Sequence, residues 1–143
     1  MILVDTSAWV EYDRATGSPV DERLAQLIET EGPVAVTEPV RMEVLAGARD
    51  DRRERELRRL LLRFELLRFD ALVDFDGAVR VYRRCRAAGV TPRGLIDCMI
   101  AAVAKRSEAS LLAYDGAVAP VCRSHLHRGE NHAVRRAALD ARR

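Results

Sequence analysis

The stretch Pro92-Arg93-Gly94-Leu95-Ile96-Asp97-Cys98-Met99-Ile100-Ala101-Ala102-Val103-Ala104 is the segment around which the chain is organised. From Gly94 onward, apolar residues occupy nearly every position, which predicts a helix that is buried on all sides. Asp97 interrupts this helix in its first turn. Burying an unpaired, ionised carboxylate is costly, so Asp97 is expected to be capped, paired, protonated or bound to a cation.

The whole chain has the size and composition of one globular domain. It has 143 residues, of which 48% are hydrophobic and 32% are charged, and this length is sufficient for one core. The net charge of +2 does not by itself identify a nucleic-acid-binding protein. The three cysteines contain no C-x-x-C pair, which favours a reducing compartment. No signal peptide or membrane-spanning segment is predicted, so we expect a cytoplasmic protein.

Short apolar runs alternate with helical segments along the chain. This alternation predicts a single α/β domain, with a short central parallel sheet flanked by helices in three layers. The predicted strands are residues 1–4, 34–36, 65–69 and 111–113. The predicted helices are residues 8–14, 21–31, 39–47, 49–64, 72–88 and 94–106.

Four acidic residues occupy comparable places in this pattern. Asp5 and Asp115 each follow a predicted strand, and Glu43 and Asp97 lie on helices that begin after a turn. In an α/β fold such turns gather on one side of the sheet. Four carboxylates there would repel one another unless a divalent cation neutralised them. Carboxylate and water oxygens suit Mg²⁺ or Mn²⁺, which lower the pKa of a bound water and polarise a phosphodiester.

Each of these acids also has a purely structural interpretation. Asp5 is suited to cap the helix that follows it, and Glu43 is an ordinary solvated helix residue on this view. Asp97 lies near the free backbone N–H groups of a helix start. Asp115 precedes a glycine, as turn residues often do. These interpretations remain open residue by residue, but they do not explain why all four acids fall at equivalent places.

The four acids lie in four blocks of sequence, which are MILVDTSAWV at residues 1–10, TEPVRMEVLAG at 37–47, RGLIDCMIAA at 93–102 and LLAYD at 111–115. Together, these blocks resemble those of the PIN-domain ribonucleases, and most closely those of the VapC-type toxins of bacterial toxin–antitoxin pairs. The blocks follow the family's order over residues 1 to about 121. One block alone is a weak signal, whereas the ordered set is specific.

The resemblance implies metal-dependent cleavage of cellular RNA, with Mg²⁺ as the cofactor and Mn²⁺ able to substitute. On this basis, Asp5, Glu43, Asp97 and Asp115 would hold the metal and its activated water. Thr6 would support a carboxylate or a bound water, and Arg93 would contact RNA or pair with a carboxylate. The toxin branch further implies growth arrest, a homodimer, a cognate antitoxin and no membrane association.

The chain departs from the family's pattern towards its end. Relatives carry another acid and an aromatic residue shortly after the fourth acid, where this chain has Ala117 and Val118. We therefore expect one firmly held ion. We divide the chain into a nuclease domain over residues 1–121 and an atypical basic tail over residues 122–143, which shows no closing strand. The tail's cysteine and three histidines match no spacing of a structural zinc site.

The same sequence is also compatible with other functions. A housekeeping PIN-type nuclease of RNA processing and a non-catalytic RNA- or protein-binding module, using the arginine-rich helices, remain open. A phosphatase of the haloacid dehalogenase type would need a second aspartate where this chain has Ser7. Cys98 is expected to be a small core residue, and Trp9 and Tyr12 are expected to pack against their own helix's neighbours.

Overall fold

The structure is a computed structural model, and it describes residues 1–114. Within these residues, four parallel strands form one sheet in the order β3-β2-β1-β4. The sheet confirms the predicted fold class. The strands are β1 (Ile2–Val4), β2 (Val34–Val36), β3 (Glu65–Leu66) and β4 (Ser110–Leu112).

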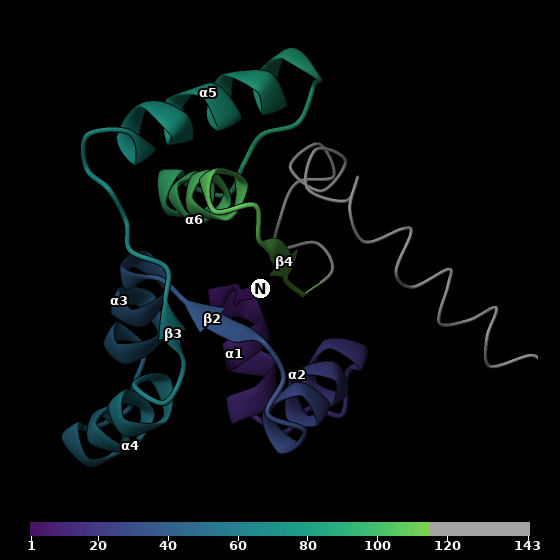
Figure 1. Ribbon diagram of the computed structural model, residues 1–143, viewed down its shortest axis with the longest axis vertical. Coiled ribbons are helices and arrows are strands. Elements are labelled where there is room, and N and C mark those ends of the chain that lie inside the picture. The colour runs from purple at the N-terminus through teal and green to yellow at the C-terminus, as the bar shows by residue number, and fades with distance from the viewer. Residues whose placement is uncertain (115–143) are drawn as a thin grey trace, which may run out of the picture.

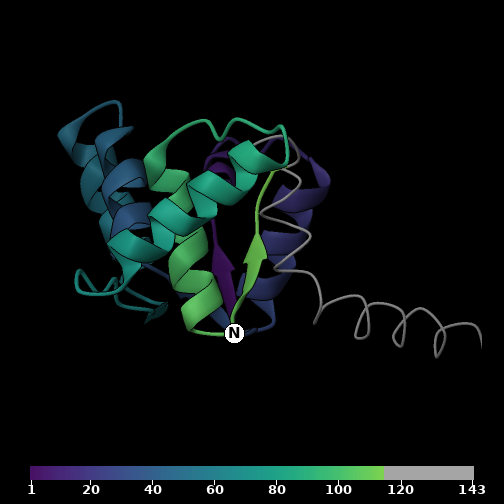
Figure 2. The ribbon, with the colours of Figure 1, turned by 90° about the horizontal axis from the view of Figure 1, so that it is seen from above.

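Helices cover both faces of this sheet. They are α1 (Thr6–Asp13), α2 (Pro19–Glu29), α3 (Glu38–Ala46), α4 (Asp51–Leu61), α5 (Asp74–Ala87) and α6 (Leu95–Arg106). Figure 1 shows α6 on one side of the sheet with α5 lying across it, and α1 and α2 on the other side. The turned view in Figure 2 places α5 and α6 in front of β1 and β4 in the same way. In the part of the chain that the structure describes, no helix has the length and apolarity needed to cross a membrane.

Helix α6 lies close to the centre of the core, as its apolar sequence predicts. Its residues 100–104 are at most 5% exposed. Its burial is not complete, however, because Leu95 in the first turn is 60% exposed. Helix α5 approaches α6 very closely at Gly77, where an added Cβ would lie 3.0 Å from the Cβ of Ala102. The close approach fixes which face of α5 points towards α6.

Several element boundaries differ from the prediction because side chains cap the helices. The helix predicted to start at residue 21 starts at Pro19, since the Ser18 hydroxyl accepts a hydrogen bond from the Asp21 N–H. The helix predicted over residues 49–64 begins only after Asp50, whose carboxylate accepts from the Arg53 N–H at 2.7 Å. Helix α4 is therefore shorter at both ends than its arginine-rich sequence suggested.

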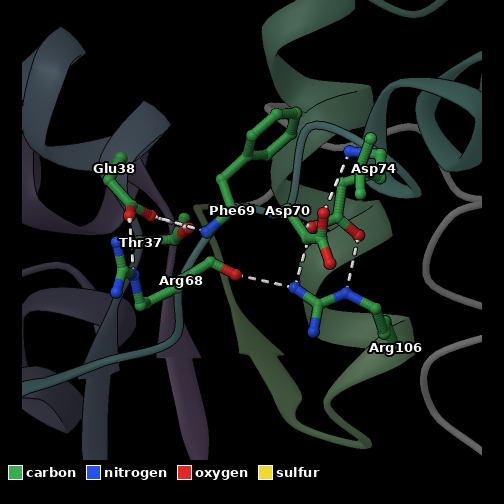
Figure 3. A network of polar contacts seen from close by, with 8 residues as sticks. Thr37, Glu38, Arg68, Phe69, Asp70, Asp74 and Arg106 are labelled. Atoms are coloured by element: carbon green, nitrogen blue, oxygen red, sulfur yellow. Dashed lines mark hydrogen bonds and ion pairs between the residues drawn. The ribbon is translucent and has the colours of Figure 1, made fainter.

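Strand β3 is also shorter than the predicted 65–69. The Leu67 N–H still donates to the Val36 carbonyl of β2, at 2.8 Å. Two residues later, the Phe69 N–H donates to the Glu38 carboxylate instead, at 2.6 Å. A side chain at the start of α3 thus replaces the strand pairing and directs the chain towards α5 (Figure 3).

An ion pair between an exposed arginine and a buried aspartate joins the end of α6 to the start of α5. The Arg106 guanidinium donates to both carboxylate oxygens of Asp74 at 2.8 Å, and also to the Arg68 carbonyl at 2.6 Å (Figure 3). Asp74 is only 2% exposed. Burial opposes ionisation of Asp74, but the hydrogen bonds from Arg106 and from the Asp70 N–H, together with the charge of Arg106, hold its pKa below the usual value. This contact anchors the helix that carries Asp97.

Candidate active site

Three of the four predicted acids line one open cleft. Asp5 directly follows β1, Glu43 lies on α3 and Asp97 lies in the first turn of α6. The cleft has a volume of about 490 Å³, and its remaining lining residues are Thr6, Ser7 and residues 93–96. The fourth acid, Asp115, lies outside the described residues, as do Ala117, Val118 and the whole predicted tail. The alternation of strands and helices therefore brings together side chains that are up to 92 positions apart in the sequence.

Asp5 performs two tasks with its two carboxylate oxygens. Its Oδ2 atom caps α1 by accepting hydrogen bonds from the Ser7 N–H at 3.0 Å and the Ser7 hydroxyl at 2.5 Å. Its Oδ1 atom is buried and has no hydrogen-bond partner among the described residues. The helix-cap interpretation of Asp5 was therefore correct, but capping occupies only one oxygen and leaves the other without a hydrogen-bond partner among the described residues.

Ser7 is a residue of the site whose role the sequence reasoning missed. Besides donating to Asp5, its hydroxyl accepts a hydrogen bond from the Tyr114 N–H at 3.0 Å. Ser7 thus links the end of β1 to the chain that follows β4. A signal was present in the sequence, because a serine two residues after a capping aspartate has its N–H in reach of that carboxylate.

Glu43 is held in the cleft by a neighbour from another helix. The Thr6 hydroxyl at the start of α1 donates to Glu43 Oε1 at 2.7 Å. Glu43 is half-buried, so the interpretation of this residue as an ordinary solvated helix residue was wrong. Because the hydrogen bond joins α1 to α3, it fixes the Glu43 carboxylate relative to the end of β1.

Asp97 is the acid whose ionisation the site opposes. Burial, together with the charges of Asp5 and Glu43, raises its pKa to about 6, although the charge of Arg93 acts in the opposite direction. No side-chain hydrogen bond caps α6, whose N-cap residue is Gly94. The pKa of Asp97 is therefore raised because its carboxyl group is partly removed from water and lies near two other acids.

The other residues singled out near the site differ in their exposure to solvent. Arg93 is exposed at the edge of the cleft, and it is the basic residue among those that line it. Cys98, next to Asp97, is 1% exposed, and burial raises the pKa of its thiol to about 11. A thiol with such a pKa is protonated near neutral pH and is a poor nucleophile, in agreement with the prediction of a core residue. Trp9 is 2% exposed and packs its ring edge against Tyr12.

The chemistry of the cleft fits a divalent cation. Its oxygen donors are carboxylates, which suit Mg²⁺ and Mn²⁺. Asp5 Oδ1 is buried and has no hydrogen-bond partner among the described residues, and burial together with the charges of Asp5 and Glu43 raises the pKa of Asp97. Among residues 1–114, however, no three acidic, histidine or cysteine side chains converge tightly enough to surround an ion as they lie. Binding therefore requires the carboxylates to turn towards one another, or further ligands.

Comparison with known proteins places the chain in a family. The model of the PIN domain family matches residues 2–123. The chain is 45% identical over 116 residues to the protein named Ribonuclease VapC11 of Mycobacterium tuberculosis, and equally to that named VapC ribonuclease Mb1587 of Mycobacterium bovis. Each match covers 80% of this chain and 87% of the relative.

Solved structures share the fold. The structure of Mycobacterium tuberculosis VapC20, described as a toxin that cleaves the sarcin–ricin loop, is 19% identical, with a TM-score of 0.63 over 81% of this chain and 91% of that one. The structure of FitAcB from Neisseria gonorrhoeae is 20% identical, with a TM-score of 0.60 over 88% of this chain and 93% of that one. Family match, sequence identity and fold agree, and the chain therefore belongs to the PIN domain family, as a ribonuclease of the VapC group of toxins from toxin–antitoxin systems.

Proposed function

We propose that Asp5, Glu43 and Asp97, together with Asp115, form a Mg²⁺ site that cleaves cellular RNA, with Mn²⁺ able to replace Mg²⁺. The observation that carries this proposal is the meeting of three carboxylates from three separate elements in one cleft. Burial and the charges of Asp5 and Glu43 together raise the pKa of Asp97. A cation bound there would neutralise this charge, lower the pKa of a water molecule and polarise the scissile phosphodiester.

The other residues of the cleft position these acids. Thr6 donates to one oxygen of Glu43 and leaves the second free for a ligand. Ser7 occupies Oδ2 of Asp5, and Oδ1 keeps no hydrogen-bond partner among the described residues. Arg93, exposed at the edge, is placed to contact a phosphate of the RNA substrate, or to pair with the Asp97 carboxylate when no substrate is bound.

We infer the partners from the same site and from the relatives. The substrate is RNA, which places the activity in the cytoplasm. A cognate antitoxin would inhibit the toxin, since structural neighbours include a toxin–antitoxin complex from Klebsiella pneumoniae. We further infer a homodimer, as the toxin branch of the family implies, and one strongly held ion because position 117 is alanine. The basic tail over residues 122–143 stays a prediction, because it lies outside the described residues.

Cleavage assays with purified full-length protein test the proposal. The parent should cut cellular RNA in Mg²⁺ or Mn²⁺, lose this activity in excess EDTA, and regain it when Mn²⁺ is added back. The Asp97→Asn variant should be at least about 100-fold slower, as expected for the loss of a metal ligand. Asp51→Asn is the matched control, because Asp51 also lies in the first turn of a helix but is exposed and does not line the cleft. Cleavage that survives the chelator, or equal rates for Asp97→Asn and the parent, would contradict the site.

Calorimetric titration with Mn²⁺ separates this enzyme from a non-catalytic binding module. We expect saturable binding to the parent, near one ion per chain, and much weaker binding to Asp97→Asn. A parent that binds RNA but not Mn²⁺ would instead support the module. Mapping the 5′ and 3′ ends of cellular RNA after brief induction of the parent and of Asp97→Asn then identifies the RNA that is cut.

A further inference from the structure

The C-terminal half of α5 carries a basic pocket that is separate from the acidic cleft. The pocket has a volume of about 480 Å³, and its lining residues are Tyr82, Arg83, Arg84, Arg86 and Ala87. We call it the α5 basic pocket. Its three arginines are exposed, and Tyr82 is partly exposed. Because residues three and four positions apart are neighbours on a helix, Arg86 lies next to both Tyr82 and Arg83.

The arginines of this pocket lack the acidic neighbours that arginines on α4 have. On α4, ion pairs with Glu54 and Glu56 neutralise Arg52, Arg53 and Arg58. Among residues 1–114, by contrast, none of the three arginines in the α5 basic pocket forms an ion pair. Like charges so close together on one helix repel one another. The pocket therefore keeps a positive charge that an anionic ligand would neutralise.

The α5 basic pocket lies close to the helix turn that carries the proposed metal ligand. Helices α5 and α6 run antiparallel, since Asp74 at the start of α5 pairs with Arg106 at the end of α6 (Figure 1). Burial raises the pKa of Cys98, and Cys85 contributes to this shift, so the last turn of α5 lies near the first turn of α6. Cys98 follows Asp97 directly in the sequence.

The loop between the two helices joins the pocket to the cleft. Arg86 donates a hydrogen bond to the Thr91 hydroxyl at 3.3 Å. The next residue, Pro92, is buried, and it is followed by Arg93, which is exposed and lines the cleft. Exposed arginines therefore lead from the pocket on α5 to the edge of the cleft.

Single-stranded RNA matches the chemistry of the α5 basic pocket. Arginines bind phosphate oxygens, and proteins that bind single strands combine such charges with aromatic rings on which bases stack. The helix dipole also favours arginines in the last turn of α5, but this effect does not account for Arg83 or Tyr82. An acidic protein would match the arginines alone. The connection to the cleft through Arg93 favours the RNA substrate instead.

We propose that the α5 basic pocket binds a nucleotide of the RNA substrate outside the cleft, with its phosphate on Arg83 and Arg86 and its base on Tyr82. The proposal rests on the RNA cleavage of the proposed function and extends its substrate-binding surface beyond the metal site. The acids of the cleft repel an RNA backbone, so a separate basic site supplies attraction that the cleft lacks.

Fluorescence anisotropy of the full-length protein with a labelled single-stranded RNA of about 12 nucleotides, in EDTA, tests the pocket. Each phosphate contact adds about 0.7 to the slope of log affinity against log salt concentration. The double variant Arg83→Gln with Arg86→Gln should bind at least about tenfold more weakly at low salt and should lower this slope by about 1.4.

The matched control is the double variant Arg55→Gln with Arg59→Gln. It also removes two exposed arginines, but from α4, which Figure 1 shows at the opposite end of the molecule from α5. The control should leave both the affinity and the slope unchanged. Equal losses in the two double variants would show an effect of net charge alone and would overturn the proposal.

Substitutions of Tyr82 test the stacking of a base. Tyr82→Ala should weaken binding of the single strand at least about fivefold and leave the salt slope unchanged, because stacking releases no counterions. Tyr82→Phe keeps the aromatic ring and should bind as the parent does. Duplex RNA of the same sequence should not respond to either variant, since its bases are already stacked on one another. An equal loss for the single strand and the duplex would contradict the assignment of Tyr82.

Cleavage kinetics separate the α5 basic pocket from the metal site. With cellular RNA and Mn²⁺, the α5 arginine double variant should raise the apparent KM and leave kcat unchanged, because it removes binding that the ground state and the transition state share. Its Mn²⁺ affinity in calorimetry should equal that of the parent, and thermal unfolding establishes that it is folded. A lower kcat at unchanged KM would overturn the proposal.

Two further outcomes distinguish this inference from the proposed function and from a protein partner. A parent that binds RNA through the pocket but cleaves none with Mn²⁺ would refute the proposed function and leave the pocket as an RNA site. A double variant that binds RNA as the parent does, but no longer binds a co-purified antitoxin, would make the pocket a protein-binding site and would overturn the proposal.

Discussion

Replacing Asp97 by asparagine should stabilise the metal-free protein, although it should abolish the proposed activity. The parent's carboxyl group has its pKa raised from 3.8 to about 6 by burial and by the charges of Asp5 and Glu43. Because the folded pKa lies above the unfolded value, ionising Asp97 destabilises the folded state. This cost is absent well below pH 3.8, develops as the pH rises from 3.8 to about 6 and is complete above that. Asparagine has a similar shape and carries no charge, so the folded variant does not bear the free-energy cost of ionisation.

The size of the effect follows from the shift. A shift of about two pH units corresponds to about 3 kcal/mol at most. Asp97 is only half-buried, so water screens part of it, and we expect a gain of about 1–3 kcal/mol. For a domain of this size, the melting temperature should rise by about 3–10 °C at pH 8 in EDTA. At pH 5, which lies between the two pKa values, the gain should be about half of that at pH 8.

Urea and thermal unfolding at pH 5 and pH 8, each with EDTA or with Mn²⁺, give the measurement. Asp51→Asn should be neutral or slightly destabilising, because an exposed acid in the first turn interacts favourably with the helix dipole. Added Mn²⁺ should stabilise the parent much more than Asp97→Asn, since only the parent keeps the full set of ligands. A loss of stability in Asp97→Asn at pH 8 in EDTA, or a gain that is equal at both pH values, would refute the reasoning.

Two further substitutions probe the support of the site. Thr6→Val, which removes the donor to Glu43, should lower Mn²⁺ affinity by about tenfold in calorimetry, whereas Thr16→Val, which removes a similar hydroxyl-to-glutamate bond on the surface, should not. Arg106→Met should destabilise the protein by about 2 kcal/mol in urea unfolding at pH 7, because it leaves the Asp74 carboxylate buried and without its main partner, and Lys105→Met on the exposed surface is the control. Since the pKa of Asp74 is lowered in the folded state, this difference should be present above pH 3.8 and should be lost as the pH falls below it.

The positions of the strands and helices were largely readable from the sequence, because apolar runs and polar helix faces alternate clearly. What the sequence did not reveal were boundaries decided by single side chains. Strand β3 stops at Leu66 because Glu38, distant in sequence, accepts the Phe69 N–H. Local propensity contains no information about such a contact. Ser18 and Asp50 likewise set helix starts through hydrogen bonds that could be suspected, but not assigned, from their residue types.

The site was predictable as a set and less so residue by residue. Asp5 and Asp97 were found because carboxylates at the end of a buried strand and inside an apolar helix demand an explanation. Glu43 had no such local signal, since a glutamate on a helix is usually solvated. Its place on a helix that begins after a strand-to-helix turn, and in a family block, pointed to the cleft. Ser7 was missed because its importance comes from a contact with Tyr114, 107 positions away. Asp115 stays a prediction, since it lies outside the described residues.

The two oxygens of Asp5 make different contacts, and this difference has a consequence for how this toxin can be inactivated. Oδ2 serves folding by closing the first turn of α1, whereas Oδ1 has no hydrogen-bond partner among residues 1–114 and is the oxygen that the proposed metal ion would bind. An asparagine at position 5 retains an oxygen that can accept the Ser7 N–H but lacks the negative charge. We therefore expect Asp5→Asn to give an inactive decoy, which keeps the fold and the surface of the parent but does not cleave RNA. Cells could accumulate such a decoy at levels that the active toxin would forbid, and its bound partners could be recovered intact.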